Sequence, residues 1–504
     1  MFSLFVGLTL AAPALAQNRR SAATQAASAT TQPTEDHISV TTHEITLHGK
    51  VLKYEADAGT LAIKDENDKL QAHFFFIAYR VLPAGDPATR PITFVFNGGP
   101  GSASIWLHLG TVGPMRLDLP KEGFPGPPPH RVVENQDTWL DATDLVFIDP
   151  IGTGFSRAAE GVDADQFYGV DQDVRSVGNF IRLYLTRYER WSSPKFLAGE
   201  SYGTTRAAGL ANYLIEHPGV DLNGIVLIST VLNFQTLSPD TGNDLPYALF
   251  MPTYCSVALY HHRLDGDLQA DVDGTRAAAE KWAMTDYIAA LAKGKSLTDA
   301  ERADVVKTLA RYTGLSPDYI SKARLRIDPD AFRKKLLNDQ EKIIGRYDAR
   351  VTAPDPNPAS DELNQDPSGE EYTAPYATAF NDYVRRDLKY ETDLPYETLS
   401  GTVNVHWDFG KWGYTDVSEK LRDAMLENPY LKVFVAEGYY DLATPFCSVD
   451  YTLNQLDLGK QVSDRITQSY YPSGHMIYQY APARAKLRAD IGAFMPSAVP
   501  TTQP

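Results

Sequence analysis

The sequence predicts an α/β fold with a mostly parallel central sheet, helices on both faces of that sheet, and a large helical cap insertion. Short, wholly apolar segments that suit buried strands alternate with amphipathic helical segments. This alternation stops near residue 233, charged helical segments follow, and apolar strand segments resume near residue 431. At 504 residues the chain also exceeds one ordinary core, which favours one large domain with an insertion.

Residues 1–37 precede the predicted fold. Residues 1–16 form an apolar segment ending in Ala-Leu-Ala, a pattern that signal peptidases accept, so we expect a signal peptide, atypical in having no Lys or Arg before the apolar run. Residues 17–37 contain too few apolar side chains to form a core and are expected to be a disordered leader. The prediction is a secreted or periplasmic protein.

Residues 38–232 are predicted to form the first part of the α/β core. Alternating apolar and polar residues favour antiparallel strands at 38–42, 45–48 and 72–78, separated by polar breaks at 57–59 and 65–68. Mainly apolar segments favour parallel strands at 92–96, 145–149, around 197 and at 224–229. Helical patterns connect them at 171–188 and 207–215.

Residues 233–407 are predicted to form the helical cap, with helical segments at 275–293 and 298–312. A capping-box pattern starts at Thr298, and Gly314 suits the end of that helix. Another helix is expected to start at Ser316 and Pro317. The stretch 352–371 is rich in Asp, Pro, Asn and Ser, which predicts a long loop. An independent second domain is less favoured, because strand segments resume afterwards.

Residues 408–496 are predicted to complete the core, with strands at 431–436 and 466–471 and a helix after Ala481. Residues 497–504 form a polar tail. The two cysteines, Cys255 and Cys447, either form a disulfide in an exported protein or remain separate buried thiols, and the sequence leaves both alternatives open.

Charge and composition narrow the classes of partner. Nucleic acids and anionic membranes require a basic surface, so the net charge of −17 argues against either as the main partner. After residue 16 the chain has no run of about 18 apolar residues, which predicts a soluble product without a membrane span. No zinc-type cluster of Cys and His is visible, and we expect no metal or organic cofactor. The oligomeric state is left undetermined.

A Gly-x-Ser-x-Gly box at Gly199–Gly203 joins an apolar strand segment to a helical pattern. Because the two glycines lack side chains, the chain can make a tight strand-to-helix turn that exposes the hydroxyl of Ser201. The N-terminus of the helix then directs free N–H groups, Tyr202 first, at any oxyanion formed there. We predict that Ser201 is a nucleophile.

A serine nucleophile needs a base, and the base needs an orienting acid; in enzymes of this architecture the chain order is Ser, Asp or Glu, His. Asp441 follows the predicted strand 431–436 and His475 follows 466–471. Such groups converge at the carboxyl ends of parallel strands, which favours these two residues. The less well placed alternatives are Glu437 and Asp450 for the acid, and His108, His217 and His406 for the base.

The segment Asn97–Gly101 is a second glycine-rich turn after a buried strand segment. Glycines there let backbone N–H groups approach a bound group, and in this architecture such a loop supplies an oxyanion donor that complements the N–H of Tyr202. A turn without a chemical role is the plain alternative. A phosphate-binding loop fits poorly, because no Lys-Ser or Lys-Thr follows.

The sequence resembles the serine carboxypeptidases, which are α/β-hydrolases that remove single residues from peptide C-termini. The resemblance spans roughly residues 90–480 and rests on motifs at 97–102, 152–156, 199–203, 438–441 and 473–476, in the family's order. It implies that the catalytic triad is Ser201, Asp441 and His475. It also implies that the N–H groups of Gly99 and Tyr202 form the oxyanion hole, and that Asn97 and Glu200 hold the substrate's terminal carboxylate.

Three residues depart from the family's pattern: Val95 stands where Trp is usual, Thr111 where Glu is frequent, and Arg157 where an aromatic residue is usual. Arg157 is therefore a further candidate for neutralising the substrate carboxylate. An ionised Glu200 would repel that carboxylate, whereas a protonated Glu200 donates a hydrogen bond to it.

The favoured function is that of a serine carboxypeptidase acting through an acyl-enzyme on Ser201, with peptides that have a free C-terminus as substrates. An acyltransferase or esterase on the same triad is the alternative among enzymes. A catalytically inert binding protein is the alternative from another class, and the intact triad argues against it. Side-chain specificity, and which cap residues line the cleft, stay open at this point.

Overall fold

The computed structural model describes residues 36–410 and 413–499, and these belong to one compact unit. The predicted signal peptide and residues 17–35 of the predicted leader lie outside the described residues. The leader prediction is wrong at its last residue, because His37 opens the first strand. In the part of the chain that the structure describes, no helix is both long enough and apolar enough to cross a membrane.

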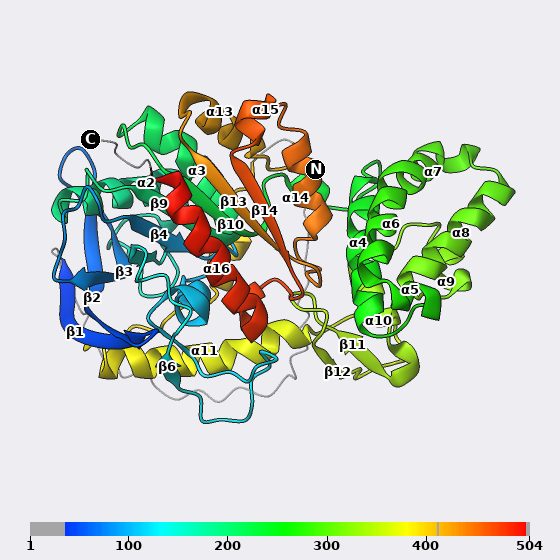
Figure 1. The fold of residues 1–504 in the computed structure, drawn as a ribbon, viewed down its shortest axis with the longest axis horizontal. Coiled ribbons are helices and arrows are strands. Elements are labelled where there is room, and N and C mark those ends of the chain that lie inside the picture. The colour runs from blue at the N-terminus through cyan, green and yellow to red at the C-terminus, as the bar shows by residue number, and fades with distance from the viewer. Residues whose placement is uncertain (1–35, 411–412, 500–504) are drawn as a thin grey trace, which may run out of the picture. The chain divides into compact units, whose positions relative to one another are not determined.

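Within the described residues, ten strands form one sheet in the order β1–β2–β3–β7–β4–β9–β10–β13–β14, with β8 beside β3 (Figure 1). The strands are β1 (His37–Leu47), β2 (Lys50–Lys64), β3 (Leu70–Leu82), β4 (Ile92–Phe96), β7 (Asp144–Ile148), β8 (Arg157–Ala158), β9 (Lys195–Ser201), β10 (Gly224–Thr230), β13 (Lys432–Gly438) and β14 (Ile466–Tyr471). The six strands from β7 to β14 in this order are parallel to one another. Beyond β7, the sheet continues through the antiparallel pairs β7–β3, β3–β2 and β2–β1. The predicted fold class is confirmed.

Helices cover both faces of this sheet. Apolar residues of α2 (Val170–Arg187), α3 (Tyr202–Glu216) and α13 (Ser418–Glu427) pack on one face. The other face is covered by α16 (Ala481–Ala498), α11 (Pro367–Arg386) and the short α1 (Ile105–Leu107). In Figure 1, α16 crosses in front of the sheet, and its Phe494 ring lies 5.5 Å from the ring of Phe434 on β13.

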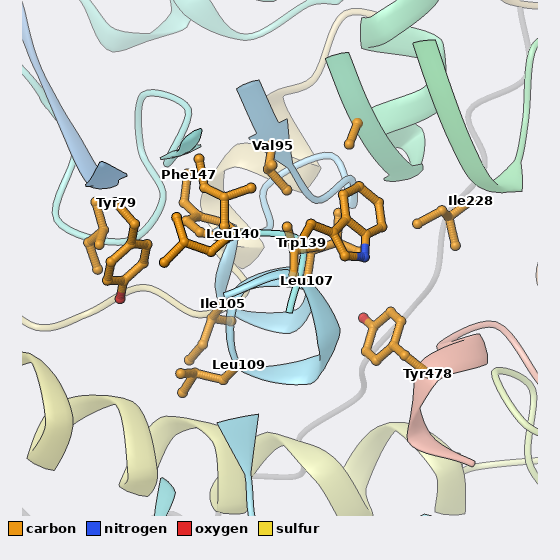
Figure 2. Close-up of a cluster of buried hydrophobic side chains, with 14 of the residues drawn as sticks. Tyr79, Val95, Ile105, Leu107, Leu109, Trp139, Leu140, Phe147, Ile228 and Tyr478 are labelled. Atoms are coloured by element: carbon orange, nitrogen blue, oxygen red, sulfur yellow. The ribbon is translucent and has the colours of Figure 1, made fainter. Parts of the chain in front are cut away.

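Figure 2 shows part of the hydrophobic cluster on the α16 face. Ile105, Leu107 and Leu109 enter it from α1 and from the π-helical turn that follows α1. Tyr478 enters the same cluster from the segment after His475. The loop after β4 and the loop after β14 are therefore anchored in one core. The chain between α1 and β7 also forms a small hairpin of β5 (Met115–Leu117) and β6 (Val132–Glu134).

The predicted break at 57–59 is wrong, because these residues lie inside β2, which pairs with β1 and β3 along its length. Asp57 is buried without disrupting the strand, since its carboxylate pairs with the guanidinium of Arg80 on β3 at 3.0 Å. Gly59 allows the close approach of β1, because a Cβ there would fall on the backbone of His37 and Ile38. The predicted strands 38–42 and 45–48 are one continuous strand, and the break at 65–68 is confirmed.

The chain between β10 and β13 is mainly helical. Its α-helices are α4 (Leu245–Tyr260), α5 (Gly266–Ala270), α6 (Val272–Trp282), α7 (Ile288–Lys293), α8 (Asp299–Thr313), α9 (Pro317–Lys322), α10 (Pro329–Lys335), α11, α12 (Gly401–His406) and α13. The capping box of Thr298 and Glu301 and the left-handed Gly314 at the end of α8 are both confirmed, as is the start of α9 after Ser316. The predicted helix 275–293 is interrupted by a π-helical turn at 283–287.

Two predictions for this region are wrong. The expected absence of strands between residues 233 and 407 is wrong, because β11 (Lys342–Ile344) and β12 (Thr352–Pro354) form an antiparallel hairpin. The predicted loop 352–371 contains β12 and the first turn of α11. At the start of α11, Asp366 accepts a hydrogen bond from the N–H of Ser368, and Pro367 occupies the first helical position. Asp, Pro and Ser favour loops, but they also favour helix starts, and composition alone does not separate the two.

After β13 the chain forms α14 (Phe446–Asn454), α15 (Lys460–Ser463), β14 and α16. The helix α16 extends to Ala498, so the polar tail predicted from residue 497 begins two residues too early. Cys255 on α4 and Cys447 on α14 are free and buried, which corresponds to the second alternative, two separate thiols. The domain boundaries at 232 and 407 stay a prediction.

Candidate active site

The predicted catalytic residues follow the carboxyl ends of parallel strands that lie in the order β4, β9, β10, β13, β14. Asn97 follows β4, Ser201 ends β9, Asp441 follows β13 and His475 follows β14. A pocket of about 110 Å³ opens at this edge of the sheet. The predicted residues that line it are Asn97, Gly99, Glu200, Ser201 and His475. Asp441 lies behind His475 and is fully buried.

Ser201 occupies a sharp turn between β9 and α3. Its backbone has φ 60° and ψ −131°, a region that non-glycine residues rarely adopt and that costs about 1–3 kcal/mol. The turn is crowded: a Cβ at Gly203 would lie 2.8 Å from the Phe96 carbonyl oxygen. The strain places the partly exposed Ser201 side chain at the pocket, with the N-terminus of α3 directly behind it.

His475 and Asp441 form the acid–base pair, with 2.6 Å between His475 Nδ1 and Asp441 Oδ2. Asp441 Oδ1 accepts hydrogen bonds from the N–H groups of Ala443 (2.7 Å) and Thr444 (3.0 Å), and the Thr444 hydroxyl donates to Oδ2 (2.7 Å). Burial opposes protonation of His475, but the charge and hydrogen bond of Asp441 raise the pKa of His475 above its ordinary value. The imidazole is therefore oriented with Nε2 left for Ser201.

The alternative acids have other partners. Glu437 is buried and accepts a hydrogen bond from the backbone N–H of Thr230 (3.1 Å). Asp450 accepts hydrogen bonds from the hydroxyl of Tyr470 and the amide of Gln468, both at 2.6 Å. Among the hydrogen bonds of the described residues, Asp441 is the carboxylate that contacts His475.

Glu200 and Asn97 form a second polar pair at the pocket. The Asn97 amide donates to Glu200 Oε1 (2.9 Å), and Asn97 Oδ1 accepts from the N–H of Leu107 (2.9 Å), which fixes the orientation of the amide. Within the described residues, Glu200 Oε2 is buried without a hydrogen-bond partner. Burial raises the pKa of Glu200 to about 7, against the opposing effects of His475 and of the nearby Tyr478 hydroxyl.

The loop after β4 contacts the serine turn through backbone atoms. A Cβ at Gly98 would lie 2.7 Å from both the Glu200 carbonyl oxygen and the Gly203 nitrogen, and it would also meet the Tyr202 nitrogen. Only glycine allows this approach, which places the N–H of Tyr202 beside the loop that carries Gly99. Arg206 of α3 fixes this loop by a hydrogen bond, because its Nη1 donates to the Asn97 carbonyl (2.7 Å). The Nε of Arg206 pairs with the carboxylate of Asp173 (2.7 Å).

The structure does not bring Arg157 to this pocket. Its Nη1 donates to the carbonyl oxygens of Gly154 and Ser156, both at 2.9 Å, and its Nη2 donates to that of Pro395 (2.8 Å). Arg157 is absent from the residues that line the pocket. Its guanidinium instead ties β8 to the chain before α12, so we do not assign it to the substrate carboxylate.

Sequence reasoning missed several residues of the site. Part of the pocket lining comes from Tyr347 and from Ser368, Gly369, Tyr372 and Thr373 of α11, and further lining residues are Trp106, Leu399 and Met476. This answers the question of which cap residues line the cleft. Thr444 was within reach of sequence analysis, because an Asp followed by Thr three positions later is a pattern in which a side chain caps a turn. Tyr347 carries no such local signal.

No three His, Cys, Asp or Glu side chains in residues 36–410 and 413–499 come together in an arrangement that could hold a metal ion.

Comparisons with known proteins show the family and the fold of the chain. The sequence model of the family described as "Serine carboxypeptidase" matches residues 48–485. Among curated proteins, the chain is similar to "Serine carboxypeptidase-like 11" of Arabidopsis thaliana, with 30% identity over 206 residues, 39% of this chain and 44% of that protein. It is also similar to "Pheromone-processing carboxypeptidase KEX1" of Debaryomyces hansenii, with 35% identity over 146 residues, 29% of this chain and 19% of that protein. The matched part spans less than half the length of these relatives.

Among solved structures, the fold is similar to that of KEX1(delta)p, a prohormone-processing carboxypeptidase from Saccharomyces cerevisiae. The TM-score is 0.55 at 16% sequence identity, and the match covers 87% of this chain and 91% of the other. At this identity the likeness concerns the fold alone. The family match covers most of the chain, including each of the segments that build the pocket, and on this basis the chain belongs to the serine carboxypeptidase family.

Proposed function

We propose that the protein is a serine carboxypeptidase that releases the C-terminal residue of peptides through an acyl-enzyme on Ser201. One observation carries the proposal: the nucleophile turn of Ser201, the His475–Asp441 pair and the Asn97–Glu200 pair share one pocket or its immediate wall. The first two provide acyl-transfer chemistry. The third provides a means of recognising a free carboxylate.

The proposed reaction gives each of these groups a role. His475 Nε2 takes the proton of the Ser201 hydroxyl as Oγ attacks the terminal peptide carbonyl. The N–H groups of Gly99 and Tyr202 stabilise the oxyanion that forms. His475 then gives the proton to the leaving amino acid as the C–N bond breaks, and water hydrolyses the remaining ester by the same steps.

Recognition of the C-terminus rests on the protonation state of Glu200. Because Oε1 accepts the hydrogen bond from Asn97, the proton of a neutral Glu200 resides on Oε2, the oxygen without a protein partner among the described residues. That O–H donates to a substrate carboxylate, whereas an ionised Glu200 repels it. We retain the predicted export of the protein, as a secreted or periplasmic enzyme, as part of this proposal.

The function is tested with a blocked dipeptide that ends in a free carboxylate and with the same dipeptide amidated at that end. A C-terminal Phe or Leu is the suitable choice, since Trp106, Tyr372 and Met476 make the pocket largely apolar. We expect release of the C-terminal residue from the free acid and little or none from the amide. Equal hydrolysis of the amide, or preferred transfer to an added alcohol, would instead favour an esterase or an acyltransferase.

Substitution of Glu200 by Gln is expected to remove the pH dependence of substrate binding. In the wild type, KM should be low below pH 7, where Glu200 is protonated, and should rise roughly tenfold per pH unit above its pKa of about 7. The Gln amide remains a donor at every pH, so KM should stay nearly constant. The measurement is KM from pH 5 to 9, with Glu419→Gln on the exposed surface of α13 as the control. A rise in KM that persists in Glu200→Gln would contradict the assignment.

A further inference from the structure

The turn at residues 345–351, which joins β11 to β12, lies between the loop that carries Asp441 and the loop that carries His475. This turn belongs to the predicted cap and is far from both loops in sequence. Its backbone hydrogen-bonds to each of them. It is therefore in a position to set the distance between the acid and the base.

On the acid side, the turn contacts both neighbours of Asp441. The N–H of Leu442 donates to the carbonyl oxygen of Arg346 (2.9 Å), and the N–H of Ala349 donates to the carbonyl oxygen of Tyr440 (3.0 Å). The residues before and after Asp441 are thus both fixed to the turn. This leaves the carboxylate little freedom to move away from the imidazole.

On the base side, the turn contacts the loop at His475 itself. The backbone N–H of His475 donates to the carbonyl oxygen of Tyr347 (2.6 Å), and the rings of the two residues lie 5.4 Å apart. Gly474 makes this contact possible, because a Cβ there would lie 2.6 Å from the Cα of Asp348 and would also meet the Tyr347 carbonyl. The packing is backbone against backbone, so small displacements are transmitted directly.

A buried ion pair holds the turn in shape. Arg350 and Asp348 are 8% and 5% exposed, and their closest atoms, Nη2 and Oδ2, lie 2.6 Å apart. The same Nη2 lies 3.3 Å from the hydroxyl of Ser473, two residues before the base, and the guanidinium faces the ring of Tyr440 at 6.0 Å. Arg350 therefore reaches from the turn to both catalytic loops.

The turn is also joined to the pocket wall. The N–H of Arg346 donates to Asp366 (3.0 Å), and the N–H of Tyr347 donates to the hydroxyl of Ser368 (2.9 Å), at the start of α11. Ser368 and Tyr347 both line the pocket. One short segment thus connects the substrate wall, the base and the acid.

We propose that the 345–351 turn is a positioning element for catalysis. Its positioning residues are Arg350 and Asp348, which keep the Asp441 loop and the His475 loop at the distance that the acid–base pair requires. The inference rests on the proposed function and adds that the cap is needed for the chemical step as well as for binding. Misplacement of a catalytic group by about 1 Å costs on the order of 100-fold in rate. Loosening the turn should therefore lower kcat much more than it raises KM.

The first test is Gly474→Ala, which forces a methyl group between the His475 loop and the turn. Gly474 does not have a positive φ, so alanine introduces the clash without backbone strain. The control is Gly459→Ala, where φ is −58° and a Cβ meets nothing within 4 Å. We expect kcat per titrated active site to fall about 100-fold in Gly474→Ala, with KM within about threefold of the wild type. Gly459→Ala should retain the wild-type values.

The second test compares Arg350→Met with Arg350→Lys, and does not depend on Gly474→Ala being stable. Methionine retains the unbranched apolar stem of the side chain but not its charged end, whereas lysine can still pair with Asp348. We expect kcat to fall at least tenfold in Arg350→Met and to be partly restored in Arg350→Lys. A purely structural role would lower the melting temperature and the fraction of active sites but leave kcat per titrated site unchanged.

The outcomes separate the two proposals. A wild-type protein that releases nothing from free-acid peptides refutes the proposed function. An active wild type whose Arg350→Met variant keeps its full kcat per titrated site, with lysine no better than methionine, refutes the positioning role of the turn while leaving the proposed function intact.

Discussion

Replacement of Ser201 by alanine is expected to lower kcat by about 10⁵- to 10⁶-fold, the loss found when the nucleophile of a serine triad is removed. The other serines that line the pocket do not replace it, because both are engaged elsewhere: Ser102 donates to the Ala103 carbonyl (3.1 Å), and Ser368 donates to Asp366 (2.7 Å). The remaining activity should come from the oxyanion donors and substrate binding alone. The measurement is peptide release at saturating substrate, together with labelling by an organophosphonate.

The alanine variant should remain folded. Alanine at φ 60° bears the same strain as serine, so we expect a melting temperature close to that of the wild type. Substrate binding should persist, since Asn97 and Glu200 are untouched, and KM should change little. Ser321→Ala, on the exposed surface of α9, is the matched control and should keep full activity and labelling. Labelling of Ser201→Ala at the wild-type rate would show that another residue is the nucleophile.

The catalytic residues could be predicted from sequence because each carries a local signal. Ser201 lies in a Gly-x-Ser-x-Gly box whose spacing suits a tight strand-to-helix turn, and Asp441 and His475 each follow a predicted strand segment. The strands β4 and β14 have the predicted bounds, and in β4 the burial of every residue produces a nearly continuous apolar run.

The missed features depend on contacts between distant parts of the chain. From sequence alone, Asp57 favours a break in the strand. In the structure the guanidinium of Arg80, on the neighbouring strand, pairs with its carboxylate, and the strand continues. The 345–351 turn and Tyr347 reach the site through hydrogen bonds to the loops of Asp441 and His475, which leave no periodic pattern in the sequence. Arg157 is an example of a local signal that gives a wrong assignment. Its charge, at a motif position where an aromatic residue is usual, suggests a contact with the substrate, but its N–H groups donate to backbone carbonyl oxygens.

Substitution of Asp441 by asparagine is expected to lower kcat by about 10⁴-fold without unfolding the protein. Asp441 Oδ1 accepts two backbone N–H groups, from Ala443 and Thr444, so the amide oxygen of asparagine must occupy that position to avoid placing donor against donor. The amide nitrogen then faces His475 Nδ1, which lies 2.6 Å from Oδ2 in the wild type.

In that arrangement Nδ1 must accept a hydrogen bond, so the imidazole proton moves to Nε2, and the atom that should take the proton of Ser201 already carries one. The defect is therefore the wrong tautomer, and the loss should appear in kcat with KM nearly unchanged. Asp450→Asn is the matched control, since Asp450 is a carboxylate that accepts from Tyr470 and Gln468 and has no hydrogen bond to His475 among the described residues. We expect Asp450→Asn to stay within a few-fold of the wild type. If Asp441→Asn instead retains more than a tenth of the wild-type kcat, or Asp450→Asn falls as far, the assignment of Asp441 as the orienting acid is wrong.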